Sequence, residues 1–325
     1  MNIVLKKVLM EPKFILKDFY HFFSNNYKLP HSYFFALLPY QFFRILLDNY
    51  LTKKFQQKFI AKYKKEYLKD KFELAKRDGI VVNKQFIDNN KLLELKEICN
   101  KIISNPSKHN VVDEGFRLKK VNQNAIHQYF RLPSFKESLS KSNTSEVNFV
   151  FDMFFSNDKL LDQLTFFSGT KVKKEEIEIA ISKDRGWNSN SDWHTDCYCH
   201  TAKAFLYLND IDKNNSPFCF LKGSHKDINI RYKVQKESLM NLIFNQNKTD
   251  NKLSDPELYL LVKESTIKDK IYNKYELLEC AYPAGSLIAA DTSGFHRKGK
   301  SNNSSNERFM INVTFHRGSM IKKLF

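Results

Sequence analysis

The sequence predicts an α+β protein with a β-sandwich or jelly-roll core and supporting helices. Helical patterns come first along the chain and short strand patterns separated by turns follow, an order typical of helices that support an antiparallel sheet. A doubly wound parallel sheet is not expected, because strands and helices do not alternate regularly and no Gly-x-Gly-x-x-Gly or P-loop motif is present. The expected strands span 176–182, 203–208, 218–221, 275–281, 286–290 and 309–316.

The composition permits a large folded domain and favours an anionic partner. The 325 residues are 42% hydrophobic and carry a formal net charge of +17, so the chain can bury a sizeable core. The charge suits nucleic acid, acidic lipid or a carboxylated or phosphorylated substrate. Alternatively, the excess charge is compositional and lies on a solvated surface, since Lys is accompanied by much Asn, Ile, Phe and Tyr. Five cysteines in no regular pattern indicate reduced thiols.

Residues 1–69 are expected to form a basic, aromatic, helical extension. Through Asp70 the chain contains 12 Lys and one Arg against five acidic residues, which gives a net charge of +8. A helix is expected over 51–68 with an aromatic stripe on one face. The stripe consists of Phe55, Phe59, Tyr63 and Tyr67. Either it packs on the main domain, or it contacts anionic membrane.

Neither a secretion signal nor a membrane-spanning run is expected. Lysines interrupt the apolar runs of the N-terminus every few residues, and no stretch reaches the roughly 18 uncharged apolar residues that would indicate a span. We therefore expect a cytoplasmic protein, which the membrane alternative would place peripherally at the inner face of the membrane.

Residues 70–325 are expected to form the main domain. A strand is expected over 79–82, followed by a helix over 91–103 that is capped by the Asp-Asn-Asn of 88–90 and buries Leu92, Leu93, Leu95, Ile98 and Ile102. Residues 105–145 look polar and irregular, and a second helix is expected over 158–167, with Gly169 as its stop. The polar, helical stretch 227–275 interrupts the strands and is a candidate lid.

The strongest chemical signal is the segment Trp193-His194-Thr195-Asp196. On an extended chain, a His and a carboxylate two residues apart point to the same side and can bind one metal ion. A second His would complete a two-His, one-carboxylate face, which leaves open positions and suits Fe(II) oxygen chemistry. His296 lies just beyond a predicted turn and strand and is the candidate for that ligand.

Arg308 is the candidate for holding a carboxylate next to this metal. It opens the predicted strand Arg-Phe-Met-Ile-Asn-Val-Thr-Phe, twelve residues after His296. The planar fork of Arg suits bidentate binding of a carboxylate. The distal carboxylate of 2-oxoglutarate would need such a residue one strand from the metal.

Several ordered landmarks resemble the phytanoyl-CoA dioxygenase family of Fe(II)/2-oxoglutarate oxygenases, over roughly residues 72–317. They are Lys76-Arg-Asp-Gly79-Ile-Val-Val, Trp193-His-Thr-Asp196, Asn215-Ser-Pro-Phe-Cys-Phe-Leu-Lys-Gly223-Ser-His-Lys226, and Ala284-Gly-Ser through His296, Gly299, Asn303, Ser304 and Arg308. The interval from His296 to Arg308 is one residue longer than is usual in the family. Arg297 and Lys298 follow the distal His, where the family commonly has small residues, and could extend into an anionic substrate site.

The resemblance implies a double-stranded β-helix, a jelly roll in which His194, Asp196 and His296 bind the iron. It also implies that Arg308 holds 2-oxoglutarate, with support from Asn303, Ser304 or the neighbouring Ser305. The reaction expected is hydroxylation of a C–H bond with consumption of O₂ and release of succinate and CO₂. Asp196 favours hydroxylation over halogenation, because halogenases of the family carry a small residue there.

The substrate is not defined by these motifs. An anionic small molecule or lipid-linked saccharide is our preferred substrate class, because the basic aromatic extension would suit it. Two alternatives remain: a noncatalytic interaction protein on the same scaffold, and a nucleic-acid-binding oxygenase. The scattered, mostly lysine charge does not favour nucleic acid. Among the other histidines, His225 is expected to fix the Gly-Ser-His turn by hydrogen bonding, and His200 and His316 to be ordinary polar residues.

Overall fold

The computed structural model describes most of the chain from residue 40 onward. The described residues are 40–63, 66–113, 126–135, 143–156, 158–186, 191–197, 199–234, 236, 271–301, 307–315 and 323. Most of the predicted insert 227–275 therefore lies outside them, although the chain is helical over 228–234.

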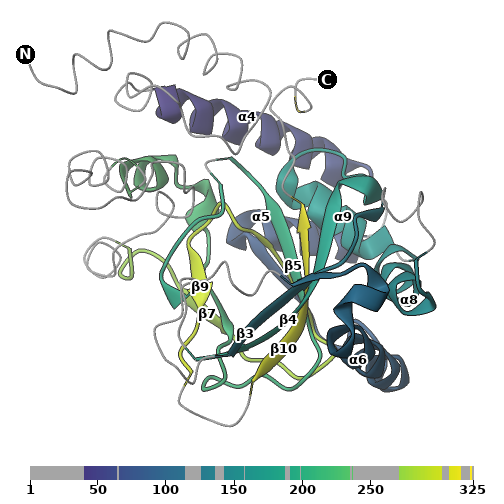
Figure 1. Cartoon of the computed structure of the whole chain (residues 1–325). Coiled ribbons are helices and arrows are strands. Elements are labelled where there is room, and N and C mark those ends of the chain that lie inside the picture. Colours follow the sequence, from purple (N-terminus) through teal and green to yellow (C-terminus); the bar gives the residue numbers. More distant parts are fainter. Residues whose placement is uncertain are drawn as a thin grey trace, which may run out of the picture.

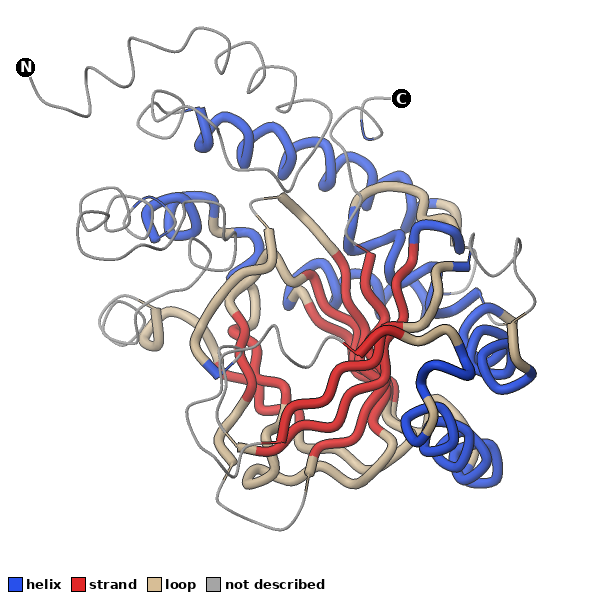
Figure 2. The backbone as a smooth tube through the Cα atoms, in the orientation of Figure 1, coloured by secondary structure: helices blue, strands red, loops and turns tan. Residues whose placement is uncertain are grey.

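Two antiparallel sheets form the core (Figures 1 and 2). The larger has the order β1-β8-β5-β10-β4-β3-β2 and the smaller has the order β7-β6-β9. The strands are β1 Ile80–Asn83, β2 Val112–Asp113, β3 Ile126–Arg131, β4 Ile177–Arg185, β5 Ala202–Tyr207, β6 Phe218–Leu221, β7 Leu277–Cys280, β8 Leu287–Asp291, β9 His296–Lys298 and β10 Arg308–Phe315.

The order in which the chain visits the two sheets defines a double-stranded β-helix. From β4 the chain crosses to the smaller sheet at His194, returns for β5, crosses again for β6 and β7, returns for β8, crosses for β9, and ends in β10 of the larger sheet. Phe205, Tyr207, Ile288 and Met310 of the larger sheet pack between the sheets against β6 and β7. The predicted jelly-roll fold is confirmed.

Helices cover the outer face of the larger sheet (Figure 1). They are α4 Tyr40–Ala61, α5 Glu66–Asp78, α6 Asn89–Ser104, α8 Ser145–Phe155 and α9 Asp158–Ser168. Alternate residues of the central strands, such as Leu206 and Ile311, face these helices in one apolar cluster, while their neighbours face the space between the sheets. One face of each central strand therefore lines the space between the two sheets, and the candidate site lies in that space.

The predicted helix over 51–68 is wrong in its boundaries. One helix, α4, ends at Ala61, and α5 begins at Glu66. The aromatic stripe lies where they meet: the rings of Phe59 and Phe166 lie 5.9 Å apart, and Tyr63 Oη donates a hydrogen bond to Asp162 (2.6 Å). These two aromatic side chains thus pack on the main domain. No described helix has the length and apolar character needed to cross a membrane.

Several local expectations are confirmed and others are wrong. Asp88 caps α6 by accepting a hydrogen bond from the backbone N–H of Lys91 (2.9 Å), but Leu93 is 63% exposed rather than inward. Helix α9 stops before Gly169, whose φ of +68° suits glycine. The stretch 105–145, expected to be irregular, contains β3 and the start of α8. All five cysteines are buried thiols that form no disulfide, as expected.

Candidate metal centre

The structure brings His194, Asp196 and His296 together. One potential ligand atom from each of the three side chains lies within 4.8 Å of the others. His194 and His296 face each other across an antiparallel bridge, in which each backbone N–H donates to the other's carbonyl at 3.0 Å. Asp196 continues the same edge, with its N–H bonded to the carbonyl of Thr292 (2.9 Å). Residues about a hundred positions apart in the sequence are therefore held on one backbone ladder.

Both imidazoles are oriented by backbone carbonyls. The Nδ1 of His194 lies 2.7 Å from the carbonyl oxygen of Asp192, and the Nδ1 of His296 lies 3.0 Å from that of Gly294. A carbonyl can only accept, so each Nδ1 is the donor and each neutral ring keeps its lone pair on Nε2. Burial, and then the neighbouring His296, lower the pKa of His194 to about 3. His194 is therefore neutral at physiological pH and could bind a metal ion through Nε2.

Asp196 supplies a negative charge to the same space. Burial opposes its ionisation, but Lys203 and His296 hold its pKa well below the usual range. Asp196 Oδ2 lies 3.6 Å from His296 Nε2 and 3.0 Å from Lys203 Nζ. This buried oxygen makes no hydrogen bond among the described residues, so its contact with Lys203 is an ion pair whose angles do not fit a hydrogen bond. The neutral imidazole of His194, the imidazole of His296 and an ionised carboxylate form the donor set of a non-haem Fe(II) face.

A second charged group lies in the same interior. Arg308 Nη2 donates to Asp184 Oδ2 (2.8 Å), Arg308 Nη1 donates to the carbonyl of Ser216 (2.9 Å), and Lys298 Nζ donates to Asp184 Oδ1 (3.0 Å). Lys298 follows His296 by two residues on β9, so both side chains lie on one face of the strand. We call Asp184, Lys298 and Arg308 the buried cation cluster, because all three are at most 5% exposed.

The buried cation cluster carries an excess positive charge. Two cations share one carboxylate, and Arg308 Nε, also buried, makes no hydrogen bond among the described residues. Burial lowers the pKa of Lys298 to about 8, so Lys298 is mostly protonated at pH 7. An uncompensated buried charge is costly, and a bound carboxylate would offset it.

The other predicted site residues are placed differently. Asn303, Ser304 and Ser305 lie outside the described residues, as does His316. Lys298 is buried and its amine is paired with Asp184, and its extension toward an anionic substrate stays a prediction. The guanidinium of Arg297 lies over the Trp193 ring, 4.7 Å from its centroid.

Sequence reasoning missed Lys203 and Asp184. The alternation of Lys-Ala-Phe-Leu-Tyr places Lys203 on the same face as Phe205, toward the interior. This signal was available, whereas the partner of Lys203 depends on the fold.

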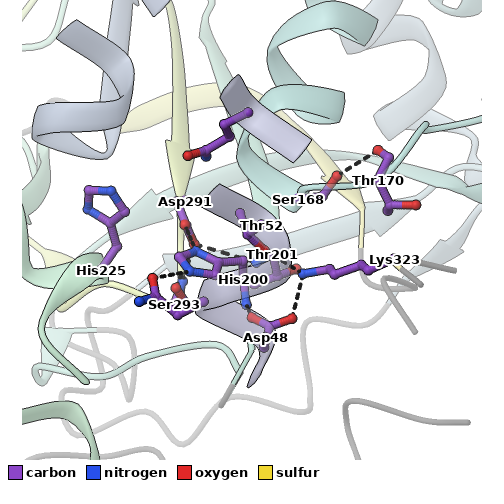
Figure 3. Close-up of polar contacts among 12 residues, drawn as sticks. Asp48, Thr52, Ser168, Thr170, His200, Thr201, His225, Asp291, Ser293 and Lys323 are labelled. Carbon is purple, nitrogen blue, oxygen red and sulfur yellow. Dashed lines mark hydrogen bonds and ion pairs between the residues drawn. The ribbon is translucent and has the colours of Figure 1, made fainter. Parts of the chain in front are cut away.

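His200 is not an ordinary polar residue (Figure 3). It is buried, its Nδ1 contacts Asp291 at short range, and its backbone N–H donates to Asp48 Oδ2 of α4 (2.6 Å). Lys323 also donates to Asp48 (2.5 Å). This network ties α4 to the end of β8, a few residues before the ligand His296. The expectation that the His225 ring fixes its turn by hydrogen bonding is wrong at Nδ1, which has no partner among the described residues.

Comparisons with known proteins give remote structural similarity. No family model matches the chain, and no curated protein matches it. Among solved structures, the epimerase SnoN in complex with Fe³⁺, alpha ketoglutarate and nogalamycin RO is 11% identical, with 77% of this chain and 84% of that chain covered and a TM-score of 0.46. EctD from S. alaskensis with 2-oxoglutarate and 5-hydroxyectoine is 12% identical, with 75% and 74% covered and a TM-score of 0.47. A prolyl-4-hydroxylase from Pseudomonas putida is 10% identical, with 75% and 96% covered and a TM-score of 0.41. At such values these similarities carry no information on activity.

Proposed function

We propose that the protein is an Fe(II)/2-oxoglutarate-dependent oxygenase of the phytanoyl-CoA dioxygenase type. The observation that carries this proposal is the triad: two imidazoles whose Nδ1 atoms donate to backbone carbonyls, and an ionised carboxylate, all with ligand atoms within 4.8 Å of one another. These three residues would hold the iron. When bound there, Fe(II) and 2-oxoglutarate would supply the activation of O₂, one oxygen atom going into succinate as CO₂ is released and the other into a C–H bond of the substrate.

The buried cation cluster supports 2-oxoglutarate as the co-substrate. Its excess charge and the unpartnered Arg308 Nε are features that a second carboxylate would satisfy. Arg308 would orient the distal carboxylate, and Lys298 would add to the attraction. Lys203, which contacts Asp196 in the free protein, would keep that carboxylate ionised and oriented toward the iron.

The substrate class in this proposal is an anionic small molecule or an anionic lipid-linked molecule. The net charge of +17 supports it. In this proposal the enzyme works in the cytoplasm, with peripheral contact between the basic N-terminal extension and anionic membrane.

The test is anaerobic addition of Fe(II), then 2-oxoglutarate, to the purified full chain. The expected result is one equivalent of bound iron and a weak visible charge-transfer band of the chelate. Asp196→Asn should abolish iron binding, and Arg308→Ala should weaken 2-oxoglutarate binding at unchanged iron affinity. Glu279→Gln is the matched control, since this carboxylate contacts Lys213 at 4.0 Å, outside the triad. A folded wild type that binds no iron would refute the proposal and favour a noncatalytic interaction protein.

A further inference from the structure

A cavity of about 240 Å³ opens between α4, α5 and the short turn η5 (Ser224–Lys226). None of the three triad residues lines it. Its lining includes the buried side chains Asn49, His200 and His225 and a set of cationic side chains from three separate elements. We call it the basic pocket.

The cationic side chains of the basic pocket are only partly neutralised. Lys76 and Arg77 of α5 are each paired with a neighbouring carboxylate. Lys53 of α4 and Lys226 of η5 form no ion pair or side-chain hydrogen bond with any residue that the structure describes. Two ammonium groups from separate elements therefore line one cavity without an ion pair to any residue that the structure describes. Like charges held together repel, and a bound anion would remove that repulsion.

The wall of the cavity contains an unsatisfied buried polar group. The His225 side chain is 2% exposed, and its Nδ1 makes no hydrogen bond among the described residues. Burial lowers the pKa of His225 to about 3, so the ring is neutral and carries one N–H. In Figure 3, His225 lies beside the His200–Asp291 pair, which is already engaged. A buried polar atom without a hydrogen-bond partner calls for an explanation, and a ligand bound nearby is one.

We propose that the basic pocket binds a phosphate group. A phosphate carries close to two negative charges and several acceptor oxygens, which match the two unpaired ammonium groups. The volume would hold roughly eight waters at about 30 Å³ each, enough for a phosphate and part of the group that it esterifies. Inorganic phosphate alone would leave room, so a phosphate ester or a diphosphate fits better.

The titration of Lys226 supports this assignment. Burial lowers its pKa, and Lys53, Arg77 and Lys76 lower it further, against the opposing effect of Asp78. The ammonium of Lys226 is thus in an unfavourable environment in the free protein. A phosphate between Lys226 and Lys53 would reverse this effect.

The phosphate could belong to a soluble ester or to a lipid headgroup. A wider groove adjoins the basic pocket, shares Lys53 and Lys226 with it, and is lined by the apolar side chains Phe42 and Leu46. An apolar wall beside a phosphate site suits either an apolar ester or the acyl region of a phospholipid. The recognised chemistry is the same in both cases.

Calorimetric titration of the full chain with pyrophosphate tests the proposal, with sodium chloride of equal ionic strength as the blank. The expected result is saturable binding of one equivalent. Lys53→Gln and Lys226→Gln should each weaken it about tenfold, the loss expected for one charge-assisted contact. Lys213→Gln is the matched control, since its side chain is 75% exposed and does not line the pocket.

Vesicles of phosphatidylcholine, with and without phosphatidic acid, distinguish the two sources of phosphate. Binding to the phosphatidic-acid vesicles that pyrophosphate displaces would identify a lipid headgroup, and pyrophosphate binding without vesicle binding would identify a soluble ester. The Lys226→Gln variant should retain the iron–2-oxoglutarate band, which separates this site from the metal centre. No saturable binding in either arm, or equal losses in Lys213→Gln and Lys226→Gln, would overturn the proposal.

Discussion

Replacing Asp184 with Asn tests whether the buried cation cluster is an excess-charge site for a carboxylate. The wild-type cluster has a net charge of +1, from Arg308, Lys298 and Asp184. In Asp184→Asn that charge becomes +2, and in Lys298→Met it becomes zero. The two substitutions therefore change the charge in opposite directions at adjoining positions.

Asp184→Asn should destabilise the free protein strongly. It removes the acceptor of ion pairs of 2.8 and 3.0 Å among side chains that are at most 6% exposed. Removing one partner of a buried ion pair costs about 3–5 kcal/mol, which corresponds to a fall in Tm of roughly 5–15 °C for a domain of this size. Glu279→Gln, which breaks an exposed pair at 4.0 Å, should cost less than about 1 kcal/mol.

The affinity for 2-oxoglutarate should follow the cluster charge and not the stability. Asp184→Asn raises the positive charge near the bound carboxylate by one unit and should bind the co-substrate more tightly than wild type. Lys298→Met lowers that charge by one unit and should bind it about tenfold more weakly. The assay is the increase in Tm produced by 2-oxoglutarate, which reports affinity by mass action. Equal ligand-induced shifts in all three proteins, or a stable Asp184→Asn, would refute this account of the cluster.

Three further substitutions test other parts of the structure. Asp291→Asn should lower the unfolding free energy by about 3–5 kcal/mol at pH 7. Because His200 holds the pKa of Asp291 well below its usual range despite burial, this stabilisation is present above about pH 4 and is lost as the pH falls further. In urea unfolding, the difference in unfolding free energy between wild type and variant should therefore narrow below about pH 4. Gly79→Ala should cost about 1–3 kcal/mol or more, because φ is +79° and a Cβ there would lie 2.7 Å from His225 Cε1; an unchanged Tm would refute this. Tyr63→Phe should cost about 1–2 kcal/mol by losing its hydrogen bond to Asp162, and a neutral result in urea unfolding would show that this contact does not hold α4 and α9 together.

Local patterns predicted the strands and helices whose causes lie within a few residues. Strand β6 spans 218–221 as expected, because four consecutive apolar residues fit a strand buried on both faces. Helix α6 begins at Asn89, two residues before the expected start, and Asp88 of the predicted capping segment is its cap, since it bonds to a residue three positions later. In such cases the sequence contains both partners of the interaction.

Elements whose stability comes from distant partners were missed. Strand β9 is the three residues His-Arg-Lys, which have no strand pattern of their own and form a strand by pairing with β6. Strand β3 lies within a polar stretch and is stabilised by six register pairs with β4. Tertiary pairing overrides local propensity at these places.

The same limit applies to the charged side chains of the site. Arg308 was identified as a carboxylate-binding residue from its type and position, but its present partner Asp184 is directly opposite it in the register between β10 and β4. That register is set by all eight residue pairs of the two strands, and no feature near either residue indicates it. Sequence alone therefore predicts which residues carry charge but not which charges neutralise each other.

The triad itself shows why a motif of two residues can still predict a site. A His and an Asp two positions apart on extended backbone point to the same side. The two reciprocal 3.0 Å backbone hydrogen bonds between His194 and His296 place His296, the proposed third ligand, directly opposite His194. Alternation on β9 then places Lys298, the next residue on that face, beside the metal ligands and against Asp184. The proposed ligand His296 and the cation Lys298 thus follow from one two-residue period on β9, whereas Arg308 joins the buried cation cluster from β10.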